Sequence, residues 1–469
     1  MKKEVMRYFG YGLLVLGMVS CQNDDDGIEN PATDPINDWM FNTMTDRYLW
    51  TDEMPSDPDR TLATTDFFNS LLFSGDRFSR IFPDYDQLIS QLDGVVLEAG
   101  YELSLVRESG TDNVLGVIIY VKEGSPAQNA GLKRGDIIRR INNTTITLGN
   151  YQELLQDIAQ HHTIDYDRYN FTTQEYEPLQ ETLSVVQLAE NPHFLDSIYT
   201  IQNGKKVGYY IYNFFSPGVG ASTAYNDQMD DIFAKFQAGG IDELVVDLRY
   251  NGGGSVDATT NLASLIAPDV TDQDVFYRYQ WNELYQGLFE NDPQLESALS
   301  GTFRIKAENI GNNLASGRVF VLVGPATASA SELIINGLTP YMDVVIIGGT
   351  TVGKNVSSIP FEDEQNPDND YGLLPIVFRV ANSLGQSDYE QGFVPGPEYT
   401  VSDIQFPLQP LGDIEEPLLA TALAEIEGQL TGRRRYPEGT GLLPLTSTLQ
   451  LNPLKNEMVL RDPALASKY

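Results

Sequence analysis

The pattern of hydrophobic and polar positions divides most of the chain into three regions. Residues 36–90 place apolar side chains at i, i+4 spacing, which is typical of helices that bury one face. Residues 93–188 instead contain short β-branched runs, of which residues 117–121 are the most continuous, and they predict strands. Residues 195–430 alternate apolar runs with segments of helical spacing. This last pattern predicts an α/β core.

Four apolar runs in the third region indicate buried strands. They lie at residues 207–211, 244–248, 318–323 and 344–347. Between the first two, Met229, Ile232, Phe233 and Phe236 have the i, i+3, i+4, i+7 spacing of a helix with one buried face. Strands that are apolar on both faces are typical of a sheet covered by helices on each side.

Composition narrows the possible functions. The 469 residues carry a formal net charge of −36, which repels phosphate backbones and argues against nucleic-acid binding. With three histidines and one cysteine, the chain offers little support for a metal site, and we expect no cofactor. A single cysteine also excludes an internal disulfide.

The beginning of the chain predicts export. Lys2, Lys3 and Arg7 precede a short apolar run at residues 8–19, and Cys21 follows. This arrangement resembles a bacterial lipoprotein signal, which implies a signal peptide at residues 1–21 and a lipid on Cys21 that binds the protein to a membrane of the cell envelope. An ordinary signal peptide is the alternative.

The next segment predicts a flexible tether at residues 22–35, because it is polar and contains two prolines. Its acidic run at residues 24–26 resembles the tag that directs some lipoproteins of Bacteroides-like bacteria to the outer face of the outer membrane. We therefore expect an outer-membrane lipoprotein that is exposed at the surface, with a periplasm-facing anchor as the alternative.

The candidate chemistry lies on two turns of the α/β region. Ser329 stands between the apolar run at 318–323 and a predicted helix, and Lys354 follows the run at 344–347. A serine hydroxyl needs a base to become nucleophilic, and all three histidines precede the core. A neutral lysine serves instead, because burial without a partner carboxylate lowers the pKa of a lysine by as much as 3–5 units.

Neighbouring residues have predicted roles too. The N–H of Ala330 and the backbone of Gly253 and Gly254 are candidates for an oxyanion hole, since a helix start and a glycine turn both present N–H groups. Ser331 is a weaker candidate nucleophile, and Glu332 fits a first-turn acid that favours the helix dipole. Asp247 and Arg249 are expected to form a structural pair.

Part of the second region resembles a PDZ domain of bacterial proteases. The resemblance rests on Gly124-Ser125-Pro126-Ala127, Ala130-Gly131-Leu132 and Arg134-Gly135-Asp136-Ile137-Ile138. It implies that a peptide C-terminus adds as a strand to an exposed edge, with its carboxylate held by the turn Gly100, Tyr101, Glu102 and Leu103. A module that only braces the fold is the alternative.

Four signals in order resemble peptidase family S41, the C-terminal (tail-specific) processing proteases. They are the PDZ segment, the run from Asp247 to Gly254, the run from Thr327 to Glu332, and Gly349-Thr350-Thr351-Val352-Gly353-Lys354. The resemblance implies a small helical domain at 36–90, a PDZ-like domain at 93–188, a crotonase-like α/β peptidase domain at 195–430 and a tail at 431–469.

For the site, the resemblance implies a dyad of Ser329 and Lys354, with oxyanion donors at Ala330 and at Gly253 or Gly254. The family often carries a glutamine four residues after the lysine, where this chain has Ser358 beside Ser357. These hydroxyls are candidates for orienting the lysine.

The sequence thus predicts a serine endopeptidase that cleaves exposed or unstructured protein C-terminal regions recruited by its PDZ-like module. The replacement at Ser358 keeps open a non-catalytic, peptide-binding surface lipoprotein. A nutrient-binding surface protein is a weaker alternative, suggested only by the aromatic residues Tyr277, Tyr279, Trp281 and Tyr285.

Overall fold

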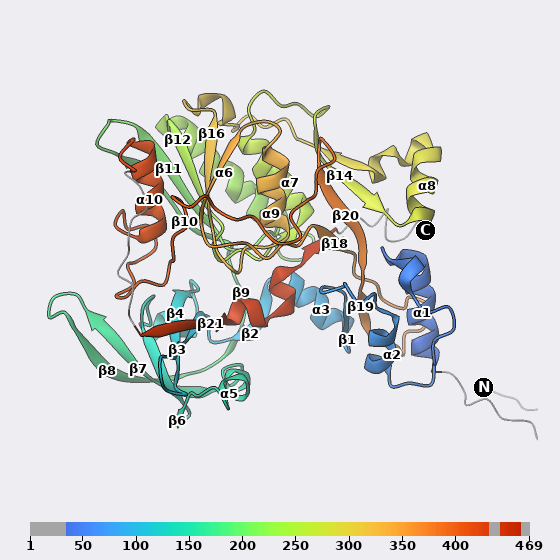
Figure 1. The fold of residues 1–469 in the computed structure, drawn as a ribbon, viewed down its shortest axis with the longest axis horizontal. Coiled ribbons are helices and arrows are strands. Elements are labelled where there is room, and N and C mark those ends of the chain that lie inside the picture. Colours follow the sequence, from blue (N-terminus) through green and yellow to red (C-terminus); the bar gives the residue numbers. More distant parts are fainter. Residues whose placement is uncertain (1–33, 431–440, 461–469) are drawn as a thin grey trace, which may run out of the picture.

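A computed structural model describes residues 34–430 and 441–460 (Figure 1). The predicted signal peptide, Cys21 and most of the predicted tether lie outside the described residues. None of the helices within the described ranges is both long enough and apolar enough to span a lipid bilayer.

The α/β core is built on a five-stranded sheet, and four of its strands contain the predicted apolar runs. Its order is β10 (His193–Thr200), β11 (Lys206–Tyr212), β12 (Glu243–Asp247), β16 (Arg318–Val323) and β17 (Asp343–Gly348). All neighbouring pairs are parallel except β10 with β11. The carboxyl ends of β12 and β16 therefore lie at the same edge, where their loops come together.

Helices cover both faces of this sheet (Figure 1). On one face, α6 (Ala224–Gly239), α7 (Val256–Ile266) and α9 (Ala330–Leu338) share a core with alternate residues of β11, β12 and β16. On the other face, α10 (Pro417–Ile426) packs against the remaining residues of those strands. The predicted i, i+3, i+4, i+7 face of α6 is buried, with Met229 and Phe233 both inaccessible.

A second sheet of six strands lies beside the core. Its order is β13 (Gly254–Ser255), β22 (Met458–Val459), β18 (Val356–Ser358), β20 (Ile376–Asn382), β14 (Val275–Trp281) and β15 (Ser300–Thr302). Strand β22 comes from the end of the chain and is parallel to both of its neighbours. The predicted tail thus contributes a strand to the sheet that carries Gly254 and Ser358.

The PDZ region forms a separate antiparallel sheet. Its strands run in the order β21 (Leu442–Ser447), β3 (Tyr101–Glu108), β4 (Val114–Val121), β5 (Ile137–Ile141), β7 (His162–Asn170) and β8 (Glu175–Leu183). The short β6 (Thr144–Thr145) pairs with β5, and α4 (Pro126–Asn129) and α5 (Tyr151–Asp157) complete the module. Apart from this sheet, β2 (Val95–Glu98) pairs with β9 (Val186–Ala189).

The N-terminal region is helical, as predicted, with α1 (Pro35–Arg47), α2 (Thr64–Leu71) and α3 (Tyr85–Leu92). Asp34 caps α1 by accepting from the N–H of Ile36 at 2.9 Å. The buried face of α1 and α2 packs on Val356 and Ile376 of the second sheet. Strand β1 (Arg80–Phe82) pairs with β19 (Gly372–Leu374), so this region is fixed close to the turn of Lys354.

The aromatic residues of the nutrient-binding alternative pack inside the protein. Tyr277 and Tyr279 lie on β14 and are at most 8% exposed, and Tyr285 lies on α8 (Glu283–Asn291) at 5%. Rings of Tyr279 and Trp281 contact Phe378 of β20. These aromatic residues form a packed cluster and do not form an exposed sugar-binding platform.

Candidate active site

Ser329 stands at the start of α9 in an unusual backbone conformation. Its φ is 61° and its ψ is −113°, in a region that few non-glycine residues adopt. The preceding turn is fixed by Thr327, whose hydroxyl accepts from the N–H of Gly324 and donates to the carbonyl of Leu248, both at 2.8 Å. Strained backbone conformations that are maintained by neighbouring contacts are concentrated at functional sites.

The hydroxyl of Ser329 differs from that of its neighbour. The Oγ atom is buried and has no hydrogen-bond partner among the described residues. Ser331 is also buried, but its hydroxyl donates to the carbonyl of Asn251 at 2.9 Å. Of the two candidate nucleophiles, Ser329 has the uncommitted hydroxyl.

Glu332 joins the serine turn to the lysine turn. Its Oε2 accepts from the backbone N–H of Ser329 at 2.7 Å and from that of Lys354 at 2.8 Å. Its Oε1 accepts from the N–H of Gly353 at 2.7 Å and from the hydroxyl of Thr351 at 2.5 Å. Since one carboxylate holds both turns, Ser329 and Lys354 lie at the same place in the fold. The sequence had suggested only a helix-dipole role for this residue.

Lys354 is fully buried, but it has a partner carboxylate. Its Nζ forms an ion pair with Glu457 and lies 4.8 Å from the ring centre of Phe78. Burial lowers the pKa of Lys354, and the charge of Glu457 opposes that effect without cancelling it. The prediction of a lysine without a partner carboxylate was therefore wrong, because the acid comes from a segment 103 residues further along the chain.

Of the predicted oxyanion donors, Gly253 and Ala330 lie close to Ser329, and both glycines are engaged in other contacts. A Cβ on Gly253 would lie 2.8 Å from Cβ of Ser329 and 3.1 Å from the backbone N of Ala330, so these backbones approach closely. The N–H of Gly253 donates to the side chain of Asn251 at 2.9 Å. Gly254 is paired with Met458 in β22.

The two candidate orienting serines contact the C-terminal segment. The hydroxyl of Ser358 donates to Oε2 of Glu457 at 3.2 Å, and that of Ser357 donates to the carbonyl of Met458 at 3.0 Å. Ser358 therefore reaches the lysine only through the carboxylate of Glu457. Sequence reasoning missed Glu457, and no local motif marks it.

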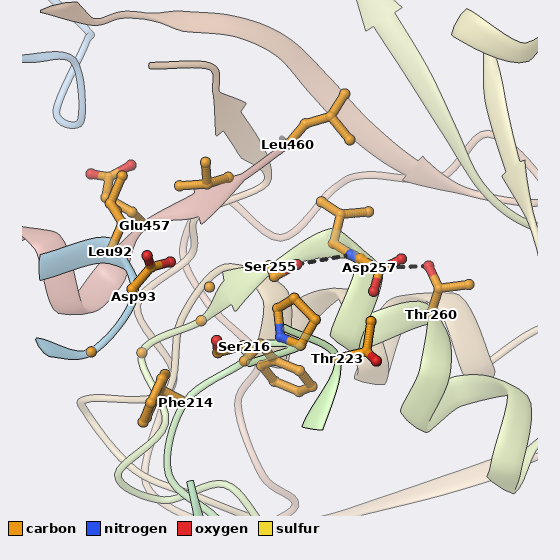
Figure 2. Close-up of a pocket in the computed structure, with 18 of the residues that line it drawn as sticks. Leu92, Asp93, Phe214, Ser216, Thr223, Ser255, Asp257, Thr260, Glu457 and Leu460 are labelled. Carbon is orange, nitrogen blue, oxygen red and sulfur yellow. Dashed lines mark hydrogen bonds between the residues drawn. The ribbon is translucent and has the colours of Figure 1, made fainter. Parts of the chain in front are cut away.

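A cavity of about 890 Å³ opens beside these turns (Figure 2). Gly253, Gly254, Phe214 and Ser216 line one part of it, and Glu457 and Leu460 line another. Figure 2 shows Glu457 and Leu460 on the opposite side of the pocket from Phe214 and Ser216. Neither Ser329 nor Lys354 is among the described residues that line this cavity, and both residues are inaccessible to solvent.

The predicted carboxylate turn also lines a cavity, of about 610 Å³, between the start of β3 and α5. Gly100, Tyr101 and Glu102 form one wall. The N–H of Leu103 donates to the hydroxyl of Thr448 at 2.9 Å, and that hydroxyl in turn donates to Glu102. Three of the four predicted residues thus line this cavity, and the backbone N–H of the fourth, Leu103, is already engaged by Thr448.

A buried charge cluster connects the PDZ region to the C-terminal segment. Lys122 forms ion pairs with Glu98, Glu102 and Glu190, and Lys455 pairs with Glu102 at 2.7 Å. Burial alone would raise the pKa of Glu102, but Lys455 and Lys122 outweigh it and lower that pKa to about 2. Glu102 therefore stays ionised at neutral pH.

The histidines are engaged elsewhere. His162 bonds to Tyr101 and to the carbonyl of Gln160, and His193 bonds to Tyr210 and to the carbonyl of Tyr225. Burial lowers the pKa of His193 to about 4. Within the described ranges, no group of histidine, cysteine and acidic side chains has the arrangement of a metal site.

Comparisons with known proteins show which family the chain resembles. The model of peptidase family S41 matches residues 206–373, that of the peptidase S41 N-terminal domain matches residues 35–80, and that of the PDZ domain matches residues 117–168. The crystal structure of a protein assigned to the S41 proteases, from Bacteroides fragilis NCTC 9343, has 32% sequence identity and a TM-score of 0.66. That alignment covers 83% of this chain and 97% of the other.

Two curated relatives are more distant. A carboxyl-terminal-processing protease of Picosynechococcus is 28% identical over 304 residues, which are 64% of this chain and 62% of the relative. A CtpA-like serine protease of Staphylococcus aureus (strain COL) is 22% identical over 234 residues, or 50% of this chain and 40% of the relative. The chain thus spans less than two thirds of the length of these curated relatives.

The α/β core, the PDZ module and the serine and lysine turns define the class of serine-type peptidases that carry a PDZ domain. Within this class, the chain belongs to peptidase family S41. The predicted α/β fold, with a PDZ β domain and a helical N-terminal region, is confirmed.

Proposed function

We propose that the protein is an endopeptidase in which Ser329 is the nucleophile and Lys354 is its general base, acting on exposed C-terminal regions of other proteins. The observation that carries this proposal is the carboxylate of Glu332, one oxygen of which accepts from the backbone N–H of both residues. Burial of Lys354, which lowers its pKa, supports a role as base.

In the proposed reaction, the neutral amine of Lys354 accepts the proton of the Ser329 hydroxyl as Oγ attacks the substrate carbonyl carbon. The N–H of Ala330 stabilises the oxyanion, assisted by the backbone of Gly253 or Gly254. The lysine then gives its proton to the leaving amine, and water releases the acyl group by the reverse sequence. The PDZ module would recruit the substrate C-terminus along β3.

The test compares cleavage of a flexible protein with an apolar C-terminus by the chain from residue 28 onward and by two variants. We expect Ser329→Ala and Lys354→Ala each to lose at least ~1000-fold in kcat/KM, as nucleophile–base pairs do. Ser331→Ala is the matched control, because its hydroxyl is committed to Asn251, and it should retain activity.

Equal cleavage by all variants would assign the reaction to another serine or to a contaminating enzyme. Peptide binding without cleavage by any of them would support the alternative of a non-catalytic, peptide-binding lipoprotein. The replacement of the family's glutamine by Ser358 is the feature that favours this alternative.

We also propose that a lipid on Cys21 binds the protein to the outer membrane, because this cysteine directly follows a basic and apolar leader. In cells that synthesise the full chain, labelled fatty acid should be incorporated into the protein and the protein should sediment with membranes. Cys21→Ala should lose the label and most of the membrane association. Retention of both by the variant would contradict the proposal.

A further inference from the structure

The end of the chain lies on both surfaces that the proposed function assigns to peptides. Residues 442–460, here called the C-terminal segment, contain β21, α11 (Thr448–Leu451), η4 (Pro453–Asn456) and β22. In Figure 1 this segment, drawn in red, runs from the PDZ sheet to the second sheet beside the core.

At the PDZ edge, the segment has the position and direction of a peptide ligand. Strand β21 is antiparallel to β3, with a register that runs from Leu442 opposite Glu108 to Ser447 opposite Ser104. Its later residues therefore approach the carboxylate turn, where the hydroxyl of Thr448 accepts from the N–H of Leu103. Strand addition at a free edge is the usual way in which a PDZ domain takes a peptide, so this edge is already occupied.

At the catalytic turns, the residue that precedes β22 lies close to both the cavity and the dyad. The point where a Cβ on Gly253 would stand is 3.0 Å from the carbonyl oxygen of Glu457 and 2.8 Å from Cβ of Ser329. Glu457 also lines the 890 Å³ cavity, whereas Ser329 is inaccessible. Movement of this segment would open space between the cavity and the turn of Ser329.

The charges of the segment match the two sites it covers. The carboxylate of Glu457 contacts Nζ of Lys354, and the ammonium of Lys455 contacts Glu102 at the PDZ turn. A carboxylate against an amine stabilises the protonated form, whereas a general base must be neutral. Glu457 in this position therefore opposes catalysis.

We propose that the C-terminal segment is an intramolecular ligand that covers the PDZ edge and the catalytic cleft together, and that peptide substrates bind by displacing it. This inference rests on the proposed function for its catalytic part, but occupation of the PDZ edge can be tested without catalysis. The apparent affinity for a competing peptide is then the intrinsic affinity multiplied by the fraction of molecules in which the segment is displaced.

The first experiment fixes β21 in place. Arg107 and Leu443 are paired across β3 and β21, and Leu443 is 52% exposed. Facing Cβ atoms in such pairs are about 4.5–5.5 Å apart, close to the spacing that a disulfide bridges. Because Cys21 is the only cysteine, a chain from residue 28 with Arg107→Cys and Leu443→Cys contains just this pair.

Binding of a fluorescent peptide with an apolar, free C-terminus is measured by anisotropy in the inactive Ser329→Ala background. We expect the oxidised protein to bind at least about tenfold more weakly than the reduced protein. The two single-cysteine variants, treated identically, should show no difference. Equal binding by the oxidised and reduced forms would overturn the proposal, whether or not the protein proves to be a peptidase.

The second experiment removes the charge at the catalytic turn. Glu457→Gln keeps the size of the side chain and should raise kcat for peptide cleavage at neutral pH, because the ammonium form of Lys354 loses its partner. Glu415→Gln, at an exposed position, is the matched control. A fall in kcat for Glu457→Gln would assign Glu457 to the orientation of the lysine and overturn its inhibitory role.

Discussion

The backbone of Ser329 has a positive φ of 61°, although serine has no particular tolerance for that conformation. Such a conformation costs about 1–3 kcal/mol and persists only where neighbouring contacts fix it. Here the N–H of Ser329 donates to Glu332, and the turn before it is fixed by Thr327. At the residue scale, Glu332 is therefore the group that positions the proposed nucleophile and base.

Glu332→Gln tests this positioning role. The NH2 group that replaces one carboxylate oxygen in glutamine cannot accept a hydrogen bond, so the donors now paired with that oxygen would be left unsatisfied. We expect the free energy of unfolding to fall by about 1–3 kcal/mol, and kcat to fall by roughly 10–100-fold with little change in KM. Urea unfolding and steady-state kinetics measure the two effects.

Glu364→Gln, at an exposed position, is the control for the change of glutamate to glutamine. If the Glu332 variant lost stability and kept its kcat, Glu332 would have a structural role alone. A fall in kcat with unchanged stability would also show that its hydrogen bonds act mainly on the geometry of the dyad.

At the scale of elements, the end of β12 is fixed to the helix on the other side of the sheet. Arg249 donates to Asp247 at 2.9 Å, as the sequence predicted, and also donates to both carboxylate oxygens of Glu416, the N-cap residue of α10. All three side chains are nearly inaccessible. The glycine loop that follows β12 thus begins from a rigid anchor.

Removing one partner of this cluster should be costly. Glu416→Gln leaves the charge of Arg249 only partly compensated, and we expect a loss of about 3–5 kcal/mol in the free energy of unfolding. The variant should also lose part of the pH dependence of stability. Burial raises the pKa of Glu416, but Arg249 outweighs this effect, so the folded-state pKa is below the ordinary value.

The direction of this pH effect follows from the linkage between protonation and folding. A carboxyl with a lowered folded-state pKa contributes stability above its unfolded pKa of about 4.3, and that stability is lost as pH falls through the folded pKa. Urea unfolding at neutral pH and at about pH 4 should therefore show a smaller difference for the variant than for the parent chain. If the variant and the parent chain showed the same difference in stability between the two pH values, Glu416 would contribute nothing to the loss of stability at acid pH.

At the scale of the whole molecule, local patterns predicted the modules and the turns. Strand and helix periods depend on neighbouring residues, so the core sheet and the face of α6 could be predicted from the sequence. The turns of Ser329 and Lys354 carried motifs as well. Partners from distant segments had no such signal, and Glu457 and Lys455 lie in the stretch that was predicted to be a tail, residues 431–469.

The same limit applies to Glu332. Its position in the first turn of a helix indicated a dipole role, because its hydrogen bonds to Thr351, Gly353 and Lys354 depend on how two loops meet. Of the predicted oxyanion glycines, Gly253 lies close to Ser329, whereas Gly254 pairs with Met458 of β22, a contact that could not be predicted from the glycine loop itself.

The position of β22 has a consequence for biosynthesis. A ribosome releases the C-terminus last, so residues 458–459 become available to the sheet only after the rest of the catalytic region has been made. Until then β13 and β18 lack their shared neighbour, so the second sheet is completed only once residues 458–459 have been synthesised. A chain that stops prematurely would therefore lack both this strand and the acid that faces Lys354.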